Sequence, residues 1–159
     1  MGVIPGIEFN TFSITGRCSR TGMLGIAITT SDITVGSRCP YVKSSVGAVA
    51  TQASTDPGLG PFALNLLQLG YSASGALQQL EASDPHIERR QLGIVDHNGN
   101  AAARTGAMNN QWAGHITGKD HVTMGNGLVG EGVVKEMADV FMHNPGLDLE
   151  ERLLRSLEA

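Results

Sequence analysis

Short apolar clusters, separated by polar and glycine-rich stretches, mark the first third of the chain. They occupy residues 12–14, 23–28 and 46–50. Apolar runs of this length between turn-forming residues are typical of β-strands. The Ser-Arg-Thr-Gly sequence at residues 19–22 supplies a natural turn between the first two clusters. We therefore expect residues 11–53 to form a β-region that begins with a hairpin.

The pattern becomes helical after a Pro-Gly-Leu-Gly stretch. Pro61 suits the first position of a helix, and the apolar-rich residues 62–69 end at Gly70. Ser72 can cap a second helix over residues 73–82, where apolar residues recur at intervals of three and four and so form one stripe. An Asp-Pro pair follows this stripe. We expect two short helices here.

The second half of the chain repeats the order of strands and then helices. Residues 91–96 and 101–105 are expected to form two strands, because the Asn-Gly pair between them is a strong hairpin signal. A further strand is expected at residues 121–125, followed by helices at residues 133–143 and 149–157 that an Asn-Pro-Gly sequence separates. Strands and helices in this order predict an α+β fold. A doubly wound nucleotide-binding fold would need alternating elements and a G-x-G-x-x-G sequence, and the chain has neither.

Composition favours one domain. A chain of 159 residues is long enough for one core and short for two. Charged residues make up only 16% and glycines number 21, so tight turns and close backbone contacts should be frequent. We expect residues 1–10 to be an N-terminal extension and residues 11–159 to be a single domain. Because the chain stops inside the last predicted helix, we also expect this domain to be truncated at its C-terminus.

Net charge and cysteine content limit the expected binding partners and the expected cellular compartment. A net charge of −4 and a pI near 5.7, with no basic stripe, argue against nucleic acid as a partner. No apolar run approaches the roughly 18 residues that cross a bilayer, and the N-terminus lacks the features of a signal peptide. Cys18 and Cys39 are 21 residues apart without a C-x-x-C pair, which is consistent with reduced thiols. We expect a cytoplasmic protein with no membrane partner.

Histidines and glycine-rich segments give no cofactor signature. None of the histidines has the H-x-x-x-H spacing that places two imidazoles on one helix face, so we expect no metal site. The glycine-rich residues 125–132 could direct backbone N–H groups at an anion, but they lack the lysine and Ser/Thr of a P-loop. The amide of Asn126 could be a donor to a developing oxyanion, and a tight turn would explain the same residues.

Several other residues allow both a chemical and a structural interpretation. Thr11 heads the first hairpin, where it is either an ordinary strand residue or a nucleophile, the second only if it becomes the chain terminus and its own α-amine can take the hydroxyl proton. Gln52 could be a buried polar group that neighbouring strands satisfy. Trp112, the only tryptophan, and His115 could be a packing anchor with a surface histidine or part of a binding wall.

Taken together, these segments resemble a known family. The bacterial family called domain of unknown function 1028 is similar to the N-terminal nucleophile (Ntn) hydrolases, and the resemblance covers roughly residues 11–158. The segments that carry it occur in order at residues 11–14 (TFSI), 35–40 (VGSRCP), 46–52 (VGAVATQ), 90–96 (RQLGIVD), 105–106 (TG), 112–115 (WAGH) and 125–126 (GN).

The resemblance implies a four-layer αββα sandwich and hydrolysis of an amide bond by an N-terminal residue. In the family pattern the threonine of the T-F-S-I motif follows the initiator methionine, whereas here it is Thr11, so the nucleophile depends on removal of residues 1–10. The resemblance also implies that Ser31, Gln52 and Asn126 orient the substrate or its oxyanion. Trp112 and His115 would then lie near the pocket rim.

A second departure from the family pattern lies at the C-terminus. Family members continue into further strands with a G-D-x-R-G-x-Q-S motif that this chain lacks. An exposed sheet edge would follow, with pairing into a homodimer as one outcome. The expected activity is hydrolysis of a small-molecule amide without a cofactor. The alternatives are a non-catalytic small-molecule-binding protein with the same fold, or a fragment that depends on a partner to fold.

Overall fold

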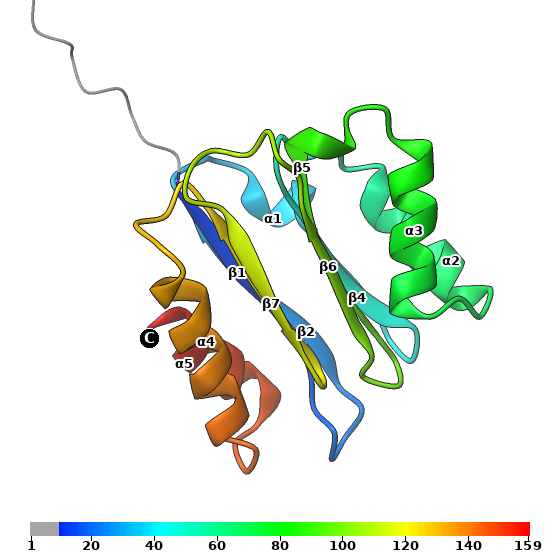
Figure 1. Cartoon of the computed structure of the whole chain (residues 1–159). Helices are drawn as coiled ribbons and strands as arrows, with labels where there is room; N and C mark the ends of the chain where they lie inside the picture. The colour runs from blue at the N-terminus through cyan, green and yellow to red at the C-terminus, as the bar shows by residue number, and fades with distance from the viewer. Residues whose placement is uncertain (1–9) are drawn as a thin grey trace, which may run out of the picture.

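Two antiparallel β-sheets face each other at the centre of the protein, and a pair of helices covers the outer face of each (Figure 1). The structure is a computed structural model that describes residues 10–159. Residues 1–9 of the expected N-terminal extension lie outside the described residues. Within the described part of the chain there are eight strands and five α-helices, so the predicted mixed α+β class is confirmed.

The first sheet combines the two ends of the chain. Its strand order is β2-β1-β8-β7, so strands from residues near 11 and residues near 126 are neighbours. The register pairs Thr11 with Thr30 on one side and with Asn126 on the other. The strands are β1 (Thr11–Arg17), β2 (Leu24–Thr30), β7 (Gly114–Gly118) and β8 (His121–Asn126).

The second sheet uses the middle of the chain, in the order β3-β4-β5-β6. All of its pairs are antiparallel and join strands that follow one another in the sequence. A Cβ atom placed on Gly93 would lie 3.0 Å from Val122 of the first sheet, so this glycine lets the two sheets approach closely. The strands are β3 (Pro40–Lys43), β4 (Gly47–Ala53), β5 (Arg90–Asp96) and β6 (Ala101–Thr105).

The side chains on the two faces of β1 have different surroundings. Ile14 and Phe12 pack against the apolar residues of the C-terminal helices, while Ser13 on the opposite face reaches the second sheet. A Cβ atom on Gly16 would lie 2.9 Å from Leu153, which explains the glycine at this position. The helices on this side are α4 (Gly132–His143) and α5 (Leu149–Leu157).

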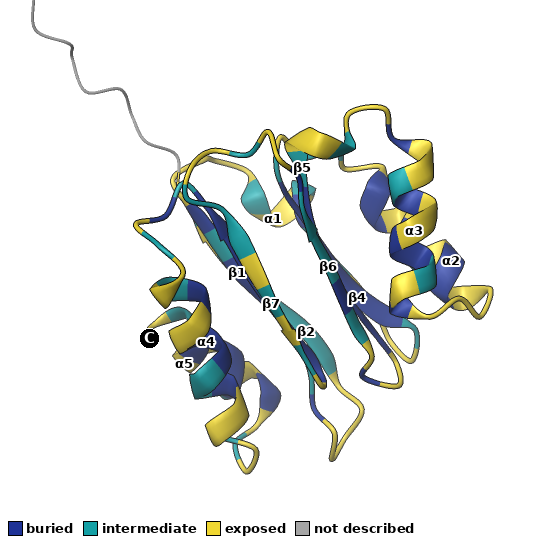
Figure 2. Ribbon diagram, in the orientation of Figure 1, coloured by how far each residue is buried: buried dark blue, intermediate teal, exposed yellow. Residues whose placement is uncertain are grey.

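The other helix pair packs on the second sheet through a wholly apolar cluster that includes Val49, Leu92 and Ile94. Figure 2 shows that the inward faces of the helices are buried and that their outward faces are exposed. The cluster follows the predicted stripe, and burial of such side chains stabilises the fold by roughly 1.5–3 kcal/mol each. The helices are α2 (Leu59–Gln68) and α3 (Ala73–Ser83), with a short α1 (Val35–Arg38) and a 3-10 turn (Ile87–Arg89) near the sheet ends.

Boundary details support most of the predicted elements. The Ser72 hydroxyl accepts the Gly75 N–H at 3.2 Å, which confirms the predicted cap of α3. Helix α2 begins at Leu59 rather than at Pro61, and this places the proline in the first turn, where its missing N–H leaves no bond unmade. Strands β3 and β7 and helix α1 were not predicted, because each has only four or five residues and little apolar periodicity.

Candidate functional site

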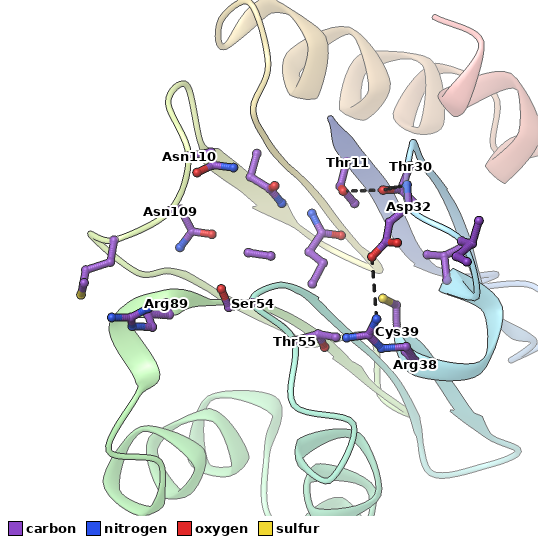
Figure 3. A pocket seen from close by; sticks show the side chains of 16 residues that line it. Thr11, Thr30, Asp32, Arg38, Cys39, Ser54, Thr55, Arg89, Asn109 and Asn110 are labelled. Atoms are coloured by element: carbon purple, nitrogen blue, oxygen red, sulfur yellow. Dashed lines mark hydrogen bonds and ion pairs between the residues drawn. The ribbon is translucent and has the colours of Figure 1, made fainter. Parts of the chain in front are cut away.

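A cavity of about 290 Å³ lies where β1 begins and β8 ends (Figure 3). Its wall combines residues from both sheets and from the segments that follow β2, β4 and β6. Residues with polar or charged side chains outnumber apolar ones in the lining. The lining residues are Thr11, Thr30, Asp32, Ile33, Val35, Arg38, Cys39, Gln52, Ala53, Ser54, Thr55, Arg89, Met108, Asn109, Asn110 and Asn126.

Thr11 is held at the cavity by both neighbouring strands. Thr11 is only 9% exposed, and the strand register pairs it with Thr30 on β2 and Asn126 on β8. The hydroxyl oxygens of Thr11 and Thr30 are 2.8 Å apart, so one donates to the other. The Thr30 hydroxyl also accepts the Asp32 N–H at 3.2 Å. This arrangement fixes the Thr11 side chain at the cavity wall.

A chain of buried amide side chains extends from the cavity into the space between the sheets. The Ser13 hydroxyl donates to Oε1 of Gln52 at 2.7 Å, and Nε2 of Gln52 donates to Oε1 of Gln91 at 2.6 Å. Nδ2 of Asn126 donates to the same oxygen at 3.0 Å. Gln91 therefore accepts from two cavity residues that come from different sheets.

The nitrogen of Gln91 anchors the other end of this network. Its Nε2 faces the Gly125 carbonyl at 2.8 Å, the Thr105 hydroxyl at 2.9 Å and the Gly114 carbonyl at 3.0 Å. Because all three acceptors surround the nitrogen, the amide of Gln91 has one favourable orientation. That orientation in turn determines which way the amides of Gln52 and Asn126 point.

Charged side chains line the outer part of the cavity. Arg38 forms an ion pair with Asp32 at 3.7 Å, and Arg89 lies on another side of the cavity, near Ser54 (Figure 3). Burial raises the pKa of the Cys39 thiol above its ordinary value, with Arg38 acting in the opposite direction. The Cys39 side chain is therefore a neutral part of the wall near neutral pH.

A strained turn shapes the wall after β4. Ala53 has a φ of 67°, in the left-handed region that residues other than glycine rarely adopt. The guanidinium of Arg90 donates to the Ser54 carbonyl and, at 2.7 Å, to a carboxylate oxygen of Asp84. Burial acts to raise the pKa of Asp84, but its hydrogen bonds with Arg90 and His86 outweigh that effect and lower it. These contacts hold the segment after Gln52 in place.

The structure brings together three of the six predicted site residues. Thr11, Gln52 and Asn126 all line the cavity. Ser31 follows β2, is exposed and does not line this cavity; its N–H is bonded to the carbonyl of the residue before Thr11 at 3.3 Å. Trp112 and His115 line a different cavity. The roles expected for all six stay predictions.

The second cavity has a volume of about 630 Å³ and lies beside β6 and β7. It is connected to the first through hydrogen bonds. Nδ1 of His115 is 2.9 Å from the Thr105 hydroxyl, which is also a partner of Gln91. A single path of side chains therefore runs from His115 to Asn126.

Gln91, Arg38 and Arg89 were not among the predicted site residues. Gln91 is fully buried next to the apolar residues 92–95 of β5, and a glutamine beside such a run is a usable sequence signal. Arg38 and Arg89 line the cavity through the tertiary fold; Arg38 lies in the family segment at residues 35–40, but no role was predicted for it.

Metal ligands do not cluster in residues 10–159, where no group of three or more His, Cys, Asp or Glu side chains could hold an ion. Both cysteines are free and buried. None of the described helices has the length and apolar character needed to cross a bilayer. The polar side chains that line the first cavity carry hydroxyl, amide, guanidinium, carboxylate and thiol groups.

Comparison with known proteins identifies a family and a similar solved structure. The family model described as "Family of unknown function (DUF1028)" matches residues 11–159. The crystal structure of protein SPO2555 from Silicibacter pomeroyi, which carries the same family assignment, has 31% sequence identity and a TM-score of 0.89. The match covers 94% of this chain and 69% of that chain. A search of curated proteins gave no match.

Proposed function

This chain belongs to the DUF1028 family, a family of unknown function, and from that membership and the cavity geometry we propose that it hydrolyses amide bonds of small molecules with Thr11 as an N-terminal nucleophile. The layer order of helices, two facing sheets and helices supports an αββα sandwich of the Ntn-hydrolase type. Because similar folds host different activities, the site itself must support the proposal.

One observation carries the proposal. Thr11 is the first residue of β1, its hydroxyl lies at the wall of a cavity, and the amide of Asn126 comes from the paired position on the next strand. A terminal threonine at this position would bring an α-amine, a hydroxyl and an amide donor to one end of one cavity. Terminal-threonine catalysis requires the first two groups in the same residue.

The reaction would proceed in two steps. The free α-amine of Thr11, with an ordinary pKa of about 8, takes the hydroxyl proton as Oγ1 attacks the substrate carbonyl carbon. The C–N bond then breaks, and the proton passes from the amine to the departing nitrogen. Water, deprotonated by the same amine, hydrolyses the acyl ester on Oγ1 and releases the acid. The Thr30 hydroxyl, 2.8 Å from Oγ1, holds the nucleophile in position.

Asn126 would stabilise the oxyanion of each tetrahedral intermediate. One N–H of its amide donates to Gln91, which leaves the other N–H for the substrate oxygen. Gln52 would orient the substrate from the facing sheet through its second N–H group. Its Oε1 accepts from Ser13, and its first N–H donates to Gln91. Removal of one oxyanion donor typically lowers kcat by about 100-fold to 1000-fold.

Mutation of Thr11, combined with the mass of the N-terminus, tests this proposal. The active protein should start at Thr11, and Thr11→Ala should lower amide hydrolysis at least about 1000-fold. Thr11→Ser should retain measurable activity because it keeps a hydroxyl next to the amine. Thr117→Ala, which alters an exposed threonine on β7, is the matched control and should leave activity unchanged. Full activity in a protein that keeps its Met1 terminus would refute the proposal.

A non-catalytic binding protein is the second candidate, and one observation favours it. The carbonyl of Asn10 accepts the Ser31 N–H at 3.3 Å, so the β1–β2 ladder continues past Thr11 while the chain is uncleaved. In that state the nitrogen of Thr11 is an amide and cannot take a proton, yet the cavity is formed. This candidate predicts ligand binding without turnover by a protein that retains residues 1–10.

A further inference from the structure

We infer that the cavity at Thr11 selects small amides that carry one carboxylate, and that Arg38 is the residue that recognises this group. The inference rests on the proposed function, because it names the substrate class of the same site. It concerns binding, however, and can be tested without turnover.

The cavity is positively charged in a negatively charged protein. The whole chain has a net charge of −4. Among the cavity-lining residues, two arginines face a single acid, Asp32. The thiol of Cys39 stays neutral because burial raises its pKa. The electrostatic potential in the cavity is therefore positive, although the protein as a whole is negative. This positive potential favours the binding of an anion.

Arg38 has unused hydrogen-bonding capacity. Its only carboxylate partner in residues 10–159 is Asp32, at an N···O distance of 3.7 Å, which is too long for a hydrogen bond. Both side chains are about half exposed, at 44% and 57%, so the remaining donors of Arg38 are accessible from solvent. A ligand carboxylate could take up two of these donors at once, which is the geometry that a guanidinium prefers.

The backbone of Arg38 is anchored although its side chain is not. Its carbonyl accepts hydrogen bonds from the hydroxyl groups of Tyr41 at 3.1 Å and Thr51 at 3.3 Å. The residue ends helix α1, and its guanidinium points toward the cavity in Figure 3. A fixed base with a side chain free to bind is the arrangement expected of a ligand-recognising arginine.

Arg89 adds a second positive charge from another side of the cavity. It ends the 3-10 turn before β5, is exposed and has no carboxylate partner within the described residues. It contributes to the potential and does not have to touch the ligand. The excess of one positive charge in the lining matches a carboxylate, whereas a phosphate dianion would leave a negative charge facing Asp32.

Cavity size and the neutral lining define the rest of the ligand. A volume of about 290 Å³ corresponds to roughly ten water molecules. That space accommodates an acylated amino acid and excludes a long peptide. Ser54, Thr55, Asn109 and Asn110 provide uncharged polar groups around the space that the amide would occupy. The expected ligand is therefore an N-acyl amino acid or an amide of similar size and charge.

Calorimetric titration tests this inference with two probes that differ in one group. N-acetyl-L-alanine carries a carboxylate, and N-acetyl-L-alaninamide replaces it with a carboxamide. The full chain with Thr11→Ala is used, so that binding is measured without hydrolysis. We expect the carboxylate probe to bind at least about tenfold more tightly. Arg38→Gln should remove this preference, and Asp32→Asn should strengthen it, because a competing carboxylate is lost.

Lys135→Gln is the matched control. It removes one positive charge from an exposed position on α4, away from the cavity, and should leave the preference unchanged. Equal binding of the two probes, no binding of either, or a preference that survives in Arg38→Gln would each overturn the inference. Tight, Arg38-dependent binding together with no turnover by a protein that starts at Thr11 would instead refute the proposed hydrolase and leave the inference standing.

Discussion

Two regions of this protein bury polar side chains, and the hydrogen bonding of these side chains differs between the regions. Between the sheets, the hydroxyl of Ser13 and the amides of Gln52, Gln91 and Asn126 form one connected set of hydrogen bonds. Between the first sheet and the C-terminal helices, His121 is equally buried, but its Nε2 has no partner. In the first region the amide groups bond to one another, whereas in the second the Nε2 atom of His121 has no hydrogen-bond partner among residues 10–159.

The second region stabilises its polar groups through the ring of Phe141. The guanidinium carbon of Arg152 lies 3.8 Å from the centre of this ring, and its Nη2 donates to the Phe141 carbonyl at 2.8 Å. The His121 ring lies 5.3 Å from the same ring. Asp120, the nearby acid, forms its ion pair with Arg17 at 2.8 Å. Arg152 is therefore a buried cation without a carboxylate partner in the described chain.

The amide network positions side chains at the cavity, whereas the region around Phe141 mainly packs the helices on the first sheet. A connected amide network restricts the orientation of each of its members, so it can hold Asn126 and Gln52 in place at the cavity. The region around Phe141 relies on nondirectional contacts and leaves a titratable group without a full set of partners. We therefore expect mutations in the first region to affect stability and ligand binding together, and mutations in the second to make stability depend on pH.

The largest expected effect is on the amide network. Gln91→Leu removes the oxygen that accepts one N–H of Gln52 and one N–H of Asn126, and it removes the side-chain donor to the Gly114 and Gly125 carbonyls. We expect the free energy of unfolding to fall by about 4 kcal/mol, since each buried orphan costs about 1–3 kcal/mol. Urea unfolding measures this change. Gln78→Leu, the same substitution at an exposed position on α3, is the control. A loss for Gln91→Leu no larger than that of the control would contradict the network account.

A smaller effect is expected from acidification. Burial lowers the pKa of His121 below its ordinary value of 6.5, and the positive charge of Arg152 adds to this shift. The folded state thus favours the neutral ring, so its contribution to stability is complete above 6.5. It is lost as the pH falls below that value, by up to about 1.4 kcal/mol per pH unit.

The comparison of two histidine variants measures this effect. His121→Phe keeps a ring but removes the titration, so its free energy of unfolding should fall less between about pH 7 and pH 5 than that of the wild type. His143→Phe changes an exposed histidine at the end of α4 and should leave the pH dependence as it is. The same pH dependence in His121→Phe as in the wild type would assign the loss of stability to other groups.

The smallest effect is expected at the protein surface. Arg155 and Glu151 form an ion pair at 2.7 Å on α5, with both side chains about half exposed. Pairs of this kind contribute about 0.5 kcal/mol or less. Arg155→Ala should accordingly change the urea midpoint only slightly, and less in high salt. A loss comparable to that of Gln91→Leu would show that burial is not what distinguishes the two regions.

Local pattern was enough to predict most of the fold. The apolar stripe of α3, with Ala76, Leu77 and Leu80 buried, follows from residue spacing, and the hairpin at residues 11–30 follows from its apolar clusters and turn residues. The short edge strands β3 and β7 have too few residues for a period to be recognised. Their edges are stabilised by the neighbouring strand rather than by their own sequence.

The site was predictable only in part, for a physical reason. Thr11 and Asn126 could be selected because their residue types suit a nucleophile and an oxyanion donor, and the register then places them side by side. Gln91 lies beside the apolar residues 92–95 of β5, and only the packing of the two sheets shows that its side chain bonds to residues of both. Arg38 lines the cavity because of the tertiary fold, and the periodicity of the sequence does not indicate this position.

The most direct test of the central claim is intact-mass spectrometry of the purified protein, combined with an amide-hydrolysis assay on the same sample. The active fraction should have the mass of a chain that starts at Thr11, and Thr11→Ala should abolish activity. An active fraction whose mass includes Met1, with hydrolysis that persists in Thr11→Ala, would contradict Thr11 as the nucleophile.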